Sequence, residues 1–367
     1  MIRPKLTPHI AALPDTIPFV GPETLIRQRG RPFAARLGAN ESGFGPSPKV
    51  ITALKGDVAG LWQYADPENF DLRTALAAHI GGRPENISVD RGIDGLLEMA
   101  CRQYVQAGSI VVTSLGGYPT FNYHVAAMGG VLRTVPYRND HEDLDGLAAA
   151  VRDSGAPLVY LANPDNPMGT WHSAEAVSAF IEAIPETTMI ILDEAYGETA
   201  PDGTLPPVGF SRPNLMRMRT FSKAYGLAGM RLGYVFGEAG MIAPFNRIRN
   251  QFGMSRLATV GGLAALADQN WLTHVVAQIS ASRDRLSAIA RANGFAPIAS
   301  AANFVSMDCG RDGVFAKAVL DGLIARGIFV RKPMAQGLDR CIRVSCGPEA
   351  EMALFEAALP GAIKDAA

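Results

Sequence analysis

Residues 157–196, "PLVYLANPDNPMGTWHSAEAVSAFIEAIPETTMIILDEAY", contain two short apolar runs separated by a segment with helical spacing of its apolar residues. Ser173 stands before the acidic first turn of that segment, which is typical of a residue that caps a helix N-terminus. The runs at 157–164 and 189–196 have the composition of strands. The stretch therefore predicts two strands joined by a helix, which is the connection that parallel strands require.

The same alternation extends toward the N-terminus. Two further apolar runs, "SIVVTSL" (109–115) and "VLRTVPY" (131–137), lie upstream, and the helical segment "DGLAAAVRDS" (145–154) follows them. Strands that alternate with helices predict an α/β fold, with a mostly parallel sheet covered by helices on both faces. Ligands of such sheets bind at the carboxyl ends of the strands, so the residues that follow each strand are the first candidates for a site.

The pattern changes in the last hundred residues. A long helical segment (271–294) ends at a glycine, and "NFVSMDC", "IFVRK" and "CIRVSC" read as strands around another helical segment. We therefore predict a large domain (46–265) followed by a small α+β domain (266–367). The first 45 residues hold six prolines, which predicts an extended arm without regular structure that contributes to the small domain and the active site.

The composition excludes several classes of function. Hydrophobic residues make up 48% of the 367 residues and charged residues 19%, as in an ordinary globular protein. The formal net charge is -1 and the chain has no run of Lys or Arg, which argues against a nucleic-acid partner and favours a small molecule. No stretch approaches about 18 consecutive apolar residues and the N-terminus lacks the plan of a signal peptide, so we expect no membrane span and a cytoplasmic location.

Histidines and cysteines show no metal-binding pattern. The six histidines and four cysteines form no HxH, HExxH or CxxC motif, so we expect no metal site. The cysteines are expected to be buried, reduced thiols rather than disulfides. They are Cys101, Cys309, Cys341 and Cys346.

A lysine stands at the end of a predicted strand in "TFSKAYGLAGMRLGY" (220–234). Lys223 could be an ordinary surface lysine. At a strand end, however, desolvation lowers the pKa of an amine and makes it a nucleophile toward an aldehyde. Thr220, Ser222 and Arg231 would supply donors for a phosphate. An aldehyde that carries a phosphate suggests pyridoxal 5'-phosphate, held by Lys223 as a Schiff base.

Other strand ends offer the remaining groups that this cofactor needs. Its pyridine nitrogen must stay protonated, and Asp193 in "LDEAY" could supply the carboxylate that pairs with it. Asn166 and Tyr196 could donate to the 3'-oxygen of the ring. The alternatives are a helix cap or loop carboxylate for Asp193 and ordinary turn chemistry for Asn166.

Two more segments could contact the cofactor. Phe121 could stack on the ring face, and His124 could reach the outer oxygen of the ring's carboxylate partner, although a partly buried helix histidine is the alternative. Gly92 precedes a predicted helix, so the backbone N–H groups of Ile93 and Asp94 and the helix dipole could meet a phosphate.

The ordered set "NPDNPMG", "LDEAYGE", "TFSKAYGLAGMRLGY" and "IRVSCG" resembles the fold type I pyridoxal-phosphate aminotransferases of class I/II, over nearly the whole chain. Three further stretches look most similar to the histidinol-phosphate aminotransferase branch; they are "ANESGFGPSP" (39–48), "YADPENFDLRTALA" (64–77) and "VRKP". The resemblance implies that the large domain binds the cofactor.

The resemblance also implies roles for individual residues. Lys223, once freed by substrate, would carry the proton between Cα of the substrate and C4' of the cofactor. Tyr64 would reach the cofactor phosphate from the neighbouring subunit, because active sites of the family form at the interface of a homodimer. Arg343 would bind the substrate α-carboxylate, which a guanidinium matches with two hydrogen bonds. The implied substrate contacts are Phe19, Asn40, Asn166, Arg331 and Arg343.

The chain departs from the family pattern at three positions. Phe19 in "PFVGPE" replaces a tyrosine that helps bind the substrate phosphate, Met168 replaces the usual threonine, and Phe121 replaces the usual stacking tyrosine. Because a lost hydrogen bond to a charged group costs about 1.5–3 kcal/mol, Phe19 predicts that an aromatic or other apolar amino acid is used at least as well as histidinol phosphate.

The predicted function is amino transfer from an amino acid or histidinol phosphate to a 2-oxo acid such as 2-oxoglutarate, by ping-pong half-reactions. A pyridoxal-phosphate decarboxylase of a phosphorylated amino acid is the alternative, because it would show the same motifs. A cofactor-binding regulator without catalysis is disfavoured, because the chain has no basic helix-turn-helix stretch.

Overall fold

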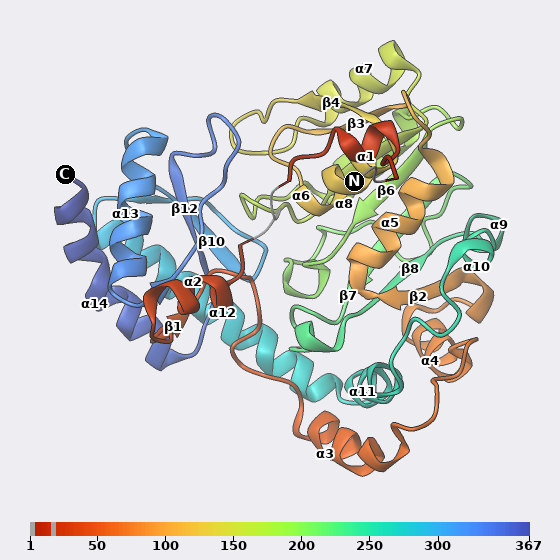
Figure 1. Ribbon diagram of the computed structural model, residues 1–367, viewed down its shortest axis with the longest axis horizontal. Helices are drawn as coiled ribbons and strands as arrows, with labels where there is room; N and C mark the ends of the chain where they lie inside the picture. Colours follow the sequence, from red (N-terminus) through yellow and green to blue (C-terminus); the bar gives the residue numbers. More distant parts are fainter. Residues whose placement is uncertain (1–3, 16–19) are drawn as a thin grey trace.

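The computed structural model describes residues 4–15 and 20–367, and within them the chain forms two packed bodies (Figure 1). The larger body is built on a seven-stranded sheet in the order β2-β8-β7-β6-β5-β3-β4. Its strands are β2 (Ile87–Arg91), β3 (Ile110–Ser114), β4 (Val131–Val135), β5 (Leu158–Ala162), β6 (Met189–Asp193), β7 (Leu215–Thr220) and β8 (Leu232–Phe236). Strands β3 to β7 are parallel, and β8 runs antiparallel to β7 and β2. The predicted mostly parallel sheet is confirmed.

Helices cover both faces of this sheet, as the sequence predicted. Val111 and Tyr160 point to the face that α5 and α6 cover, whereas their neighbours Val112 and Leu161 point to the face that α7 and α8 cover. The flanking helices are α5 (Gly92–Tyr104), α6 (Pro119–Ala127), α7 (Leu144–Ser154), α8 (Ala174–Ala183), α9 (Ala239–Ile242) and α10 (Phe245–Ile248). The expected N-cap of α8 is present, because Ser173 Oγ accepts from Ala176 N at 3.2 Å.

A third group of helices packs against the β2 and β8 edge of the sheet. They are α3 (Pro48–Asp57), α4 (Phe70–Ile80) and α11 (Arg256–Leu266). Short 3-10 helices lie at Val58–Gly60, Pro84–Asn86, Gly197–Thr199 and Ala228–Met230. Most residues of 58–70 are exposed, whereas Ala65 and Asn69 are buried.

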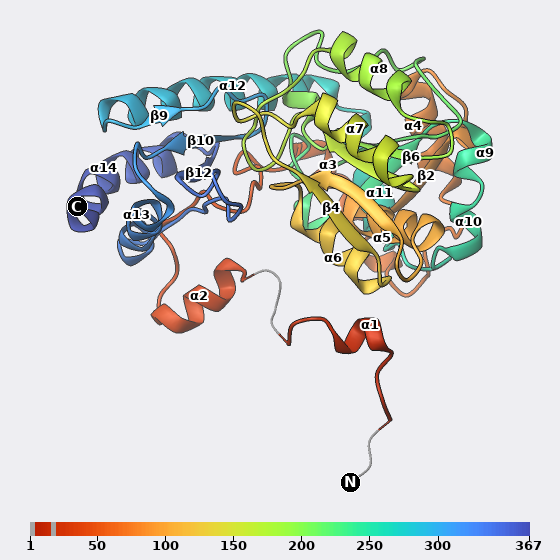
Figure 2. The ribbon, with the colours of Figure 1, turned by 90° about the horizontal axis from the view of Figure 1, so that it is seen from above.

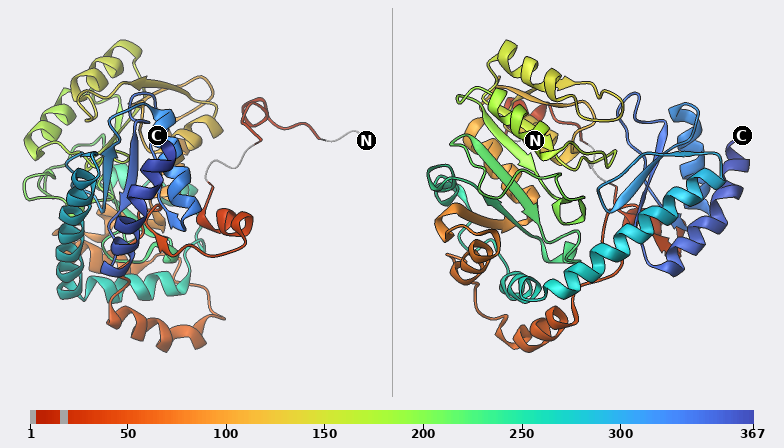
Figure 3. Two further views of the ribbon diagram at one scale, coloured as in Figure 1. Left: turned by 90° about the vertical axis from the view of Figure 1, so that its left-hand side faces the viewer. Right: turned by 180° about the vertical axis from the view of Figure 1, so that it is seen from behind.

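The smaller body follows the long helix α12 (Gln269–Ala292), which runs from the larger body to the smaller one (Figure 3). Strands β9 (Ala296–Pro297), β10 (Phe304–Asp308) and β12 (Cys341–Ser345) form an antiparallel sheet. Helices α13 (Gly313–Ala325) and α14 (Glu349–Ala366) pack with it around a separate hydrophobic core. The predicted domain limit at 265/266 falls at the end of α11 and remains a prediction.

The N-terminal arm contains more regular structure than its prolines predicted. Helices α1 (Pro8–Ala11) and α2 (Pro22–Arg29) lie at the periphery of the molecule (Figure 2), where α1 contacts α6, and β1 (Ala35–Arg36) pairs in parallel with β11 (Ile328–Phe329). The expectation of an arm without regular structure was therefore wrong. The reason is positional, since a proline at the first position of a helix has no N–H that needs a partner and its φ already suits the helix.

Candidate active site

A cavity of about 370 Å³ lies where β5, β6 and β7 end, between the larger body and β12 of the smaller one. This is the position that parallel sheets favour for ligands. The predicted site residues that line it are Asn40, Ile93, Asp94, Asn166, Asp193, Tyr196, Thr220, Ser222, Lys223, Arg231 and Arg343.

Lys223 follows β7 and lies partly buried in the cavity wall. Its Nζ donates to the backbone oxygen of Asn40 at 3.2 Å and lies 5.6 Å from the ring centroid of Tyr196. Burial and, after it, the positive charge of Arg343 lower the pKa of Lys223 to about 8. About a tenth of the amine is therefore unprotonated at pH 7, far more than for an ordinary lysine, and this form attacks aldehydes.

Asp193 ends β6 with its carboxylate buried. Oδ2 accepts from the hydroxyl of Tyr160 at 2.7 Å, and Oδ1 accepts from the backbone N of Ala195 at 2.9 Å. Burial raises the pKa of Asp193 to about 6, and the two hydrogen bonds oppose this rise because they favour the charged form. The carboxylate is therefore mostly ionised at neutral pH, as a partner for a protonated ring nitrogen must be.

Asn40 connects the cavity to the smaller body. Its backbone N donates to Ser345 Oγ at 3.0 Å, and its Nδ2 donates to the hydroxyl oxygen of Tyr196 at 3.0 Å. Burial raises the pKa of Tyr196 to about 12, so its phenol stays protonated. Tyr196 can therefore donate its hydroxyl proton to an acceptor in the cavity.

Hydroxyl and guanidinium donors gather at one end of the cavity. Thr220 Oγ1 donates to Ser222 Oγ at 3.0 Å, and Arg231 Nη1 lies 3.5 Å from the same Ser222 oxygen. Arg231 Nη2 pairs with the carboxylate of Asp94 at 3.0 Å. Arg231 has a φ of 53°, a backbone conformation that few residues other than glycine adopt. The guanidinium of this residue contacts Asp94 in the first turn of α5.

The start of α5 leaves room for an anion. Helix α5 begins at Gly92, and Ile93 and Asp94 in its first turn line the cavity. A Cβ at Gly92 would lie only 2.8 Å from Arg231 Nη2, so a larger residue would crowd the guanidinium. Free N–H groups at a helix start and an adjacent arginine together favour a phosphate.

The aromatic side chain at the cavity wall is Tyr118, not Phe121. Phe121 is fully buried and stacks on the ring of Tyr160, with centroids 4.6 Å apart. Tyr118 lines the cavity, and its hydroxyl donates to Asp94 Oδ1 at 2.9 Å. The predicted stacking of Phe121 on the ring face of the cofactor was therefore wrong. Helix α6 begins at Pro119, and this start turns the side chain of residue 121 toward the core.

His124 does not partner Asp193. Both oxygens of Asp193 are engaged by Tyr160 and Ala195, whereas His124 lies near Asp94 and Nε2 of its ring has no hydrogen-bond partner within the described residues. Burial lowers the pKa of His124, so the ring is neutral at neutral pH. The predicted contact was wrong because position 124 lies one helical turn beyond 121, on the side of α6 that faces α5.

Arg343 and Arg331 are neighbours across a backbone pair. Their N–H and C=O groups bond to each other in antiparallel fashion. Arg343 Nη1 donates to Oδ1 of Asn166, and Nη2 donates to the backbone oxygen of Gly38 at 3.4 Å. Arg331 does not line the cavity, and its Nη2 donates to the backbone oxygen of Val20. Burial and the charge of Arg343 lower the pKa of Arg331 to about 10, so its guanidinium remains positive at neutral pH.

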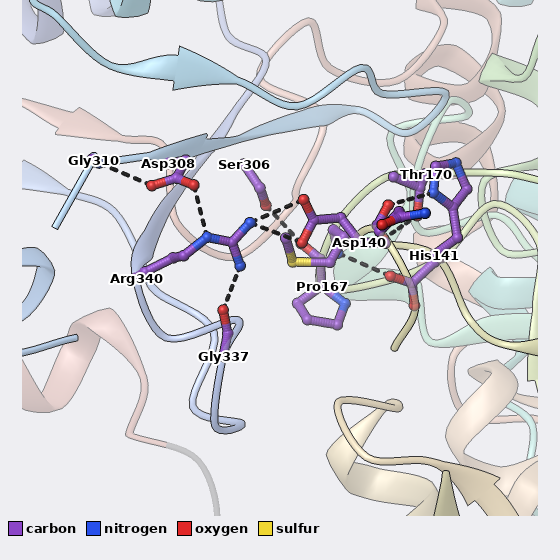
Figure 4. Close-up of polar contacts among 12 residues, drawn as sticks. Asp140, His141, Pro167, Thr170, Ser306, Asp308, Gly310, Gly337 and Arg340 are labelled. Atoms are coloured by element: carbon purple, nitrogen blue, oxygen red, sulfur yellow. Dashed lines mark hydrogen bonds and ion pairs between the residues drawn. The ribbon is translucent and has the colours of Figure 1, made fainter. Parts of the chain in front are cut away.

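Polar contacts around Arg340 hold the two bodies together (Figure 4). Arg340 lies just before β12, and its Nη2 lies 2.9 Å from both carboxylate oxygens of Asp140 in the larger body. Its Nε donates to Asp308 Oδ2 at 2.6 Å. One guanidinium therefore bridges two carboxylates across the boundary between the bodies.

A second contact in Figure 4 joins the loop after β5 to the smaller sheet. Ser306 Oγ donates to the backbone oxygen of Pro167 at 2.7 Å, and Ser306 stands opposite Arg343 in the pairing of β10 with β12. Asn166, the residue before Pro167, accepts from Arg343. The loop that carries Asn166 is thus held in register with the strand that carries Arg343.

Tyr64 lies away from this cavity. Tyr64 is 79% exposed, and its ring lies 4.8 Å from that of Phe252. It does not line the cavity of its own chain. Phe19 lies outside the described residues.

The described residues hold no group of three or more His, Cys, Asp or Glu side chains that could bind a metal ion. The four cysteines are buried and unpaired. Among the helices of residues 4–15 and 20–367, none has the length and apolar character that a membrane crossing requires.

The cavity fits a phosphorylated aldehyde with a basic ring. Lys223 supplies an amine of lowered pKa, Asp193 a buried carboxylate, and Arg231 a cation beside the open start of α5. Sequence reasoning missed Tyr118 and Tyr160. Tyr118 lies in the same strand-end segment as Phe121, and the sequence did not show which of the two faces the cavity. Tyr160 lies inside a strand, whereas the rule that ligands bind at strand ends selects only the residues that follow a strand.

Comparison with known proteins agrees with this chemistry. The sequence pattern of the family "Aminotransferase class I and II" matches residues 35–359. This chain belongs to that family, and it is a transaminase.

Individual relatives share its length and fold. The chain is 36% identical over 336 residues to histidinol-phosphate aminotransferase 1 of Nitrosococcus oceani, covering 91% of this chain and 90% of the relative. It is 36% identical to the histidinol-phosphate aminotransferase of Roseiflexus castenholzii, covering 96% of each. The crystal structure of histidinol-phosphate aminotransferase from Sinorhizobium meliloti in complex with pyridoxal-5'-phosphate is 55% identical, with a TM-score of 0.97 over 100% of this chain and 99% of that one.

Proposed function

We propose that this aminotransferase uses pyridoxal phosphate to move the amino group of histidinol phosphate to a 2-oxo acid such as 2-oxoglutarate. The observation that carries the proposal is one cavity that joins Lys223 and Asp193 to an anion-binding helix start, in a chain 55% identical to a histidinol-phosphate aminotransferase. The relatives compared above are aminotransferases, which does not favour the decarboxylase alternative. The cytoplasmic location stays a prediction.

Pyridoxal phosphate, when bound, supplies an aldehyde that takes up the amino group and a ring that withdraws electrons from the substrate Cα. Arg231, Ser222 and the first N–H groups of α5 would hold its phosphate. Asp193 would keep a proton on the ring nitrogen. Lys223 would supply the amine for the covalent link and would move the proton to and from the substrate Cα, for which a pKa near the working pH is best.

The substrate is held from the smaller body. Arg343 presents a guanidinium to the cavity, and a carboxylate or phosphate can accept two parallel hydrogen bonds from it. Because Oδ1 of Asn166 already accepts from Arg343, the amide presents its Nδ2 donor to an acceptor such as the 3'-oxygen of the cofactor. The hydroxyl of Tyr196 would be a second donor to the same 3'-oxygen.

The donor is tested by kcat/KM for histidinol phosphate and for phenylalanine, with 2-oxoglutarate as acceptor. We expect a ratio well above one for the wild type. The hypothesis based on Phe19 predicts instead a ratio of one or less, and an increase of about tenfold to a hundredfold in Phe19→Tyr, because the added hydroxyl restores a hydrogen bond to a charged group. A ratio far below one in the wild type would overturn histidinol phosphate as the main donor.

We also propose that the active unit is a homodimer to which Tyr64 contributes across the interface. Exposed large apolar side chains gather on α3, the segment that follows it and a nearby loop; this apolar patch consists of Ile51, Val58, Leu61, Trp62, Tyr64, Phe70 and Phe252. An exposed group of this kind is typical of a protein interface. The patch surrounds the residue that the family resemblance assigns to the neighbouring active site.

Trp62→Glu is expected to convert the dimer to a monomer with little remaining activity, because it places a charge in the apolar patch. Trp62 is 82% exposed in the single chain, so the substitution leaves the fold of that chain intact. Val314→Glu is a matched control, since Val314 is 78% exposed on α13, away from the patch. Sedimentation velocity at assay concentration measures the change. A fully active monomer would contradict the shared active site.

A further inference from the structure

Tyr160 and Asp193 lie on the same face of neighbouring parallel strands. In the pairing of β5 with β6, Tyr160 stands opposite Ile191 and Ala162 stands opposite Asp193. Because side chains alternate along a strand, residues 160 and 162 share a face with residues 191 and 193. The register therefore brings the hydroxyl of Tyr160 to Asp193, where it donates to Oδ2 at 2.7 Å.

Tyr160 has little freedom to move away from this contact. The side chain is fully buried, and its ring stacks on Phe121 with an angle of 18° between the planes. Phe121 is itself a fully buried residue of α6. The second oxygen of Asp193 is held by Ala195 N at 2.9 Å. Two fixed donors thus determine the orientation of the carboxylate.

The hydroxyl of Tyr160 also favours the charged form of Asp193. Burial is the main influence and raises the pKa of the carboxyl, while the hydrogen bond from Tyr160 lowers it. Burial likewise keeps the pKa of Tyr160 well above its usual value, so the phenol remains a donor. The other titratable groups whose charges act on Asp193 or feel its charge are Asp94, Glu142, Tyr196 and Lys223.

We propose that Tyr160 is a positioning residue that holds the Asp193 carboxylate ionised and oriented for the ring nitrogen of the cofactor. The inference rests on the proposed role of Asp193 in binding pyridoxal phosphate. It assigns to a tyrosine inside β5 the supporting contact that the sequence had suggested for His124. It also gives the buried Phe121 a function, because its stacked ring keeps the tyrosine in place.

The test compares Tyr160→Phe with Tyr137→Phe in apoenzyme titrated with pyridoxal phosphate. Tyr137 is a matched control, because it is a partly buried tyrosine whose hydroxyl donates to another buried carboxylate, Asp165, at 2.8 Å. We expect the Kd for the cofactor to rise about tenfold in Tyr160→Phe, as for a lost hydrogen bond to a charged group. In Tyr137→Phe it should change less than about threefold.

The pH profile separates this role from a loss of packing. Without the hydroxyl the pKa of Asp193 is higher, so the carboxylate ionises only at higher pH. The acid limb of the kcat profile should therefore move to higher pH in Tyr160→Phe, with KM little changed, and stay in place in Tyr137→Phe. An unchanged acid limb together with a Kd within twofold of wild type would overturn the proposal.

A second variant covers the case in which Tyr160→Phe does not fold. Phe121→Leu keeps the hydroxyl but removes the stacked ring, so we expect a smaller rise in the cofactor Kd and the same direction of shift in the acid limb. Wild-type values in that variant would overturn the proposal. Failure of the proposed donor gives a different result, since it would appear as a low kcat/KM for histidinol phosphate in the wild type while the cofactor Kd of Tyr160→Phe would still differ from that of the wild type.

Discussion

Replacing Lys223 by alanine is expected to remove the covalent link to pyridoxal phosphate and nearly all amino transfer, while the fold stays intact. Lys223 supplies both the nucleophile and the group that moves the proton, and loss of proton transfer alone reduces a rate by about 10²–10⁴-fold. The absorbance of the cofactor in the purified protein and single-turnover kinetics with an amino donor measure the two losses separately.

A second lysine serves as the control for this variant. Lys317 is exposed on α13 and pairs with Asp321 at 2.6 Å, so Lys317→Ala should keep wild-type turnover. The burial that lowers the pKa of Lys223 destabilises its charged form, so removing the amine should not lower the melting temperature of the apoenzyme. Full transamination by Lys223→Ala would contradict the role of Lys223 as nucleophile and proton carrier.

Asp193→Asn is expected to weaken cofactor binding and to reduce kcat severely, because a neutral pyridine withdraws electrons poorly. The amide has nearly the same shape and can accept a hydrogen bond from Tyr160 or Ala195, so the protein should still fold. Cofactor affinity of the apoenzyme and kcat for the first half-reaction measure the effect. We expect a loss of about 10²-fold or more in kcat, comparable to the removal of a general acid or base.

Asp165→Asn is the matched control for the loss of a buried carboxylate. Burial raises the pKa of Asp165 to about 7, so its charge is already partly absent at neutral pH and its replacement should change kcat much less. Near wild-type turnover in Asp193→Asn would show that another group keeps the ring nitrogen protonated.

Much of the site could be predicted because the chemistry stands at the ends of strands. Asp193 ends β6, and Lys223 follows the last residue of β7, so an alternation of apolar runs and helical segments was enough to bring them to one edge of a parallel sheet. The helix start at Gly92 was also visible, because glycine precedes an amphipathic segment. These features depend on residues close together in the sequence.

The aromatic and histidine contacts could not be predicted in the same way. Which residue of the segment after β3 faces the cavity depends on where α6 begins, because each residue of a helix is turned by about 100° from the one before. Pro119 starts the helix, so Tyr118 remains at the cavity while Phe121 turns to the core. If α6 began one residue earlier or later, the side chains of Tyr118 and Phe121 would point in different directions.

The sequence by itself determined the α/β alternation, the mostly parallel sheet and the strand-end residues, since each follows from local periodicity. Only the tertiary structure decided which other side chains form hydrogen bonds with these strand-end residues. The contact of Tyr160 with Asp193 needs the register between two strands, and the contact of Arg343 with Asn166 joins residues 177 positions apart in different bodies. The physical reason is that local spacing sets the direction of a side chain relative to its own strand or helix, whereas its partner is set by how those elements pack.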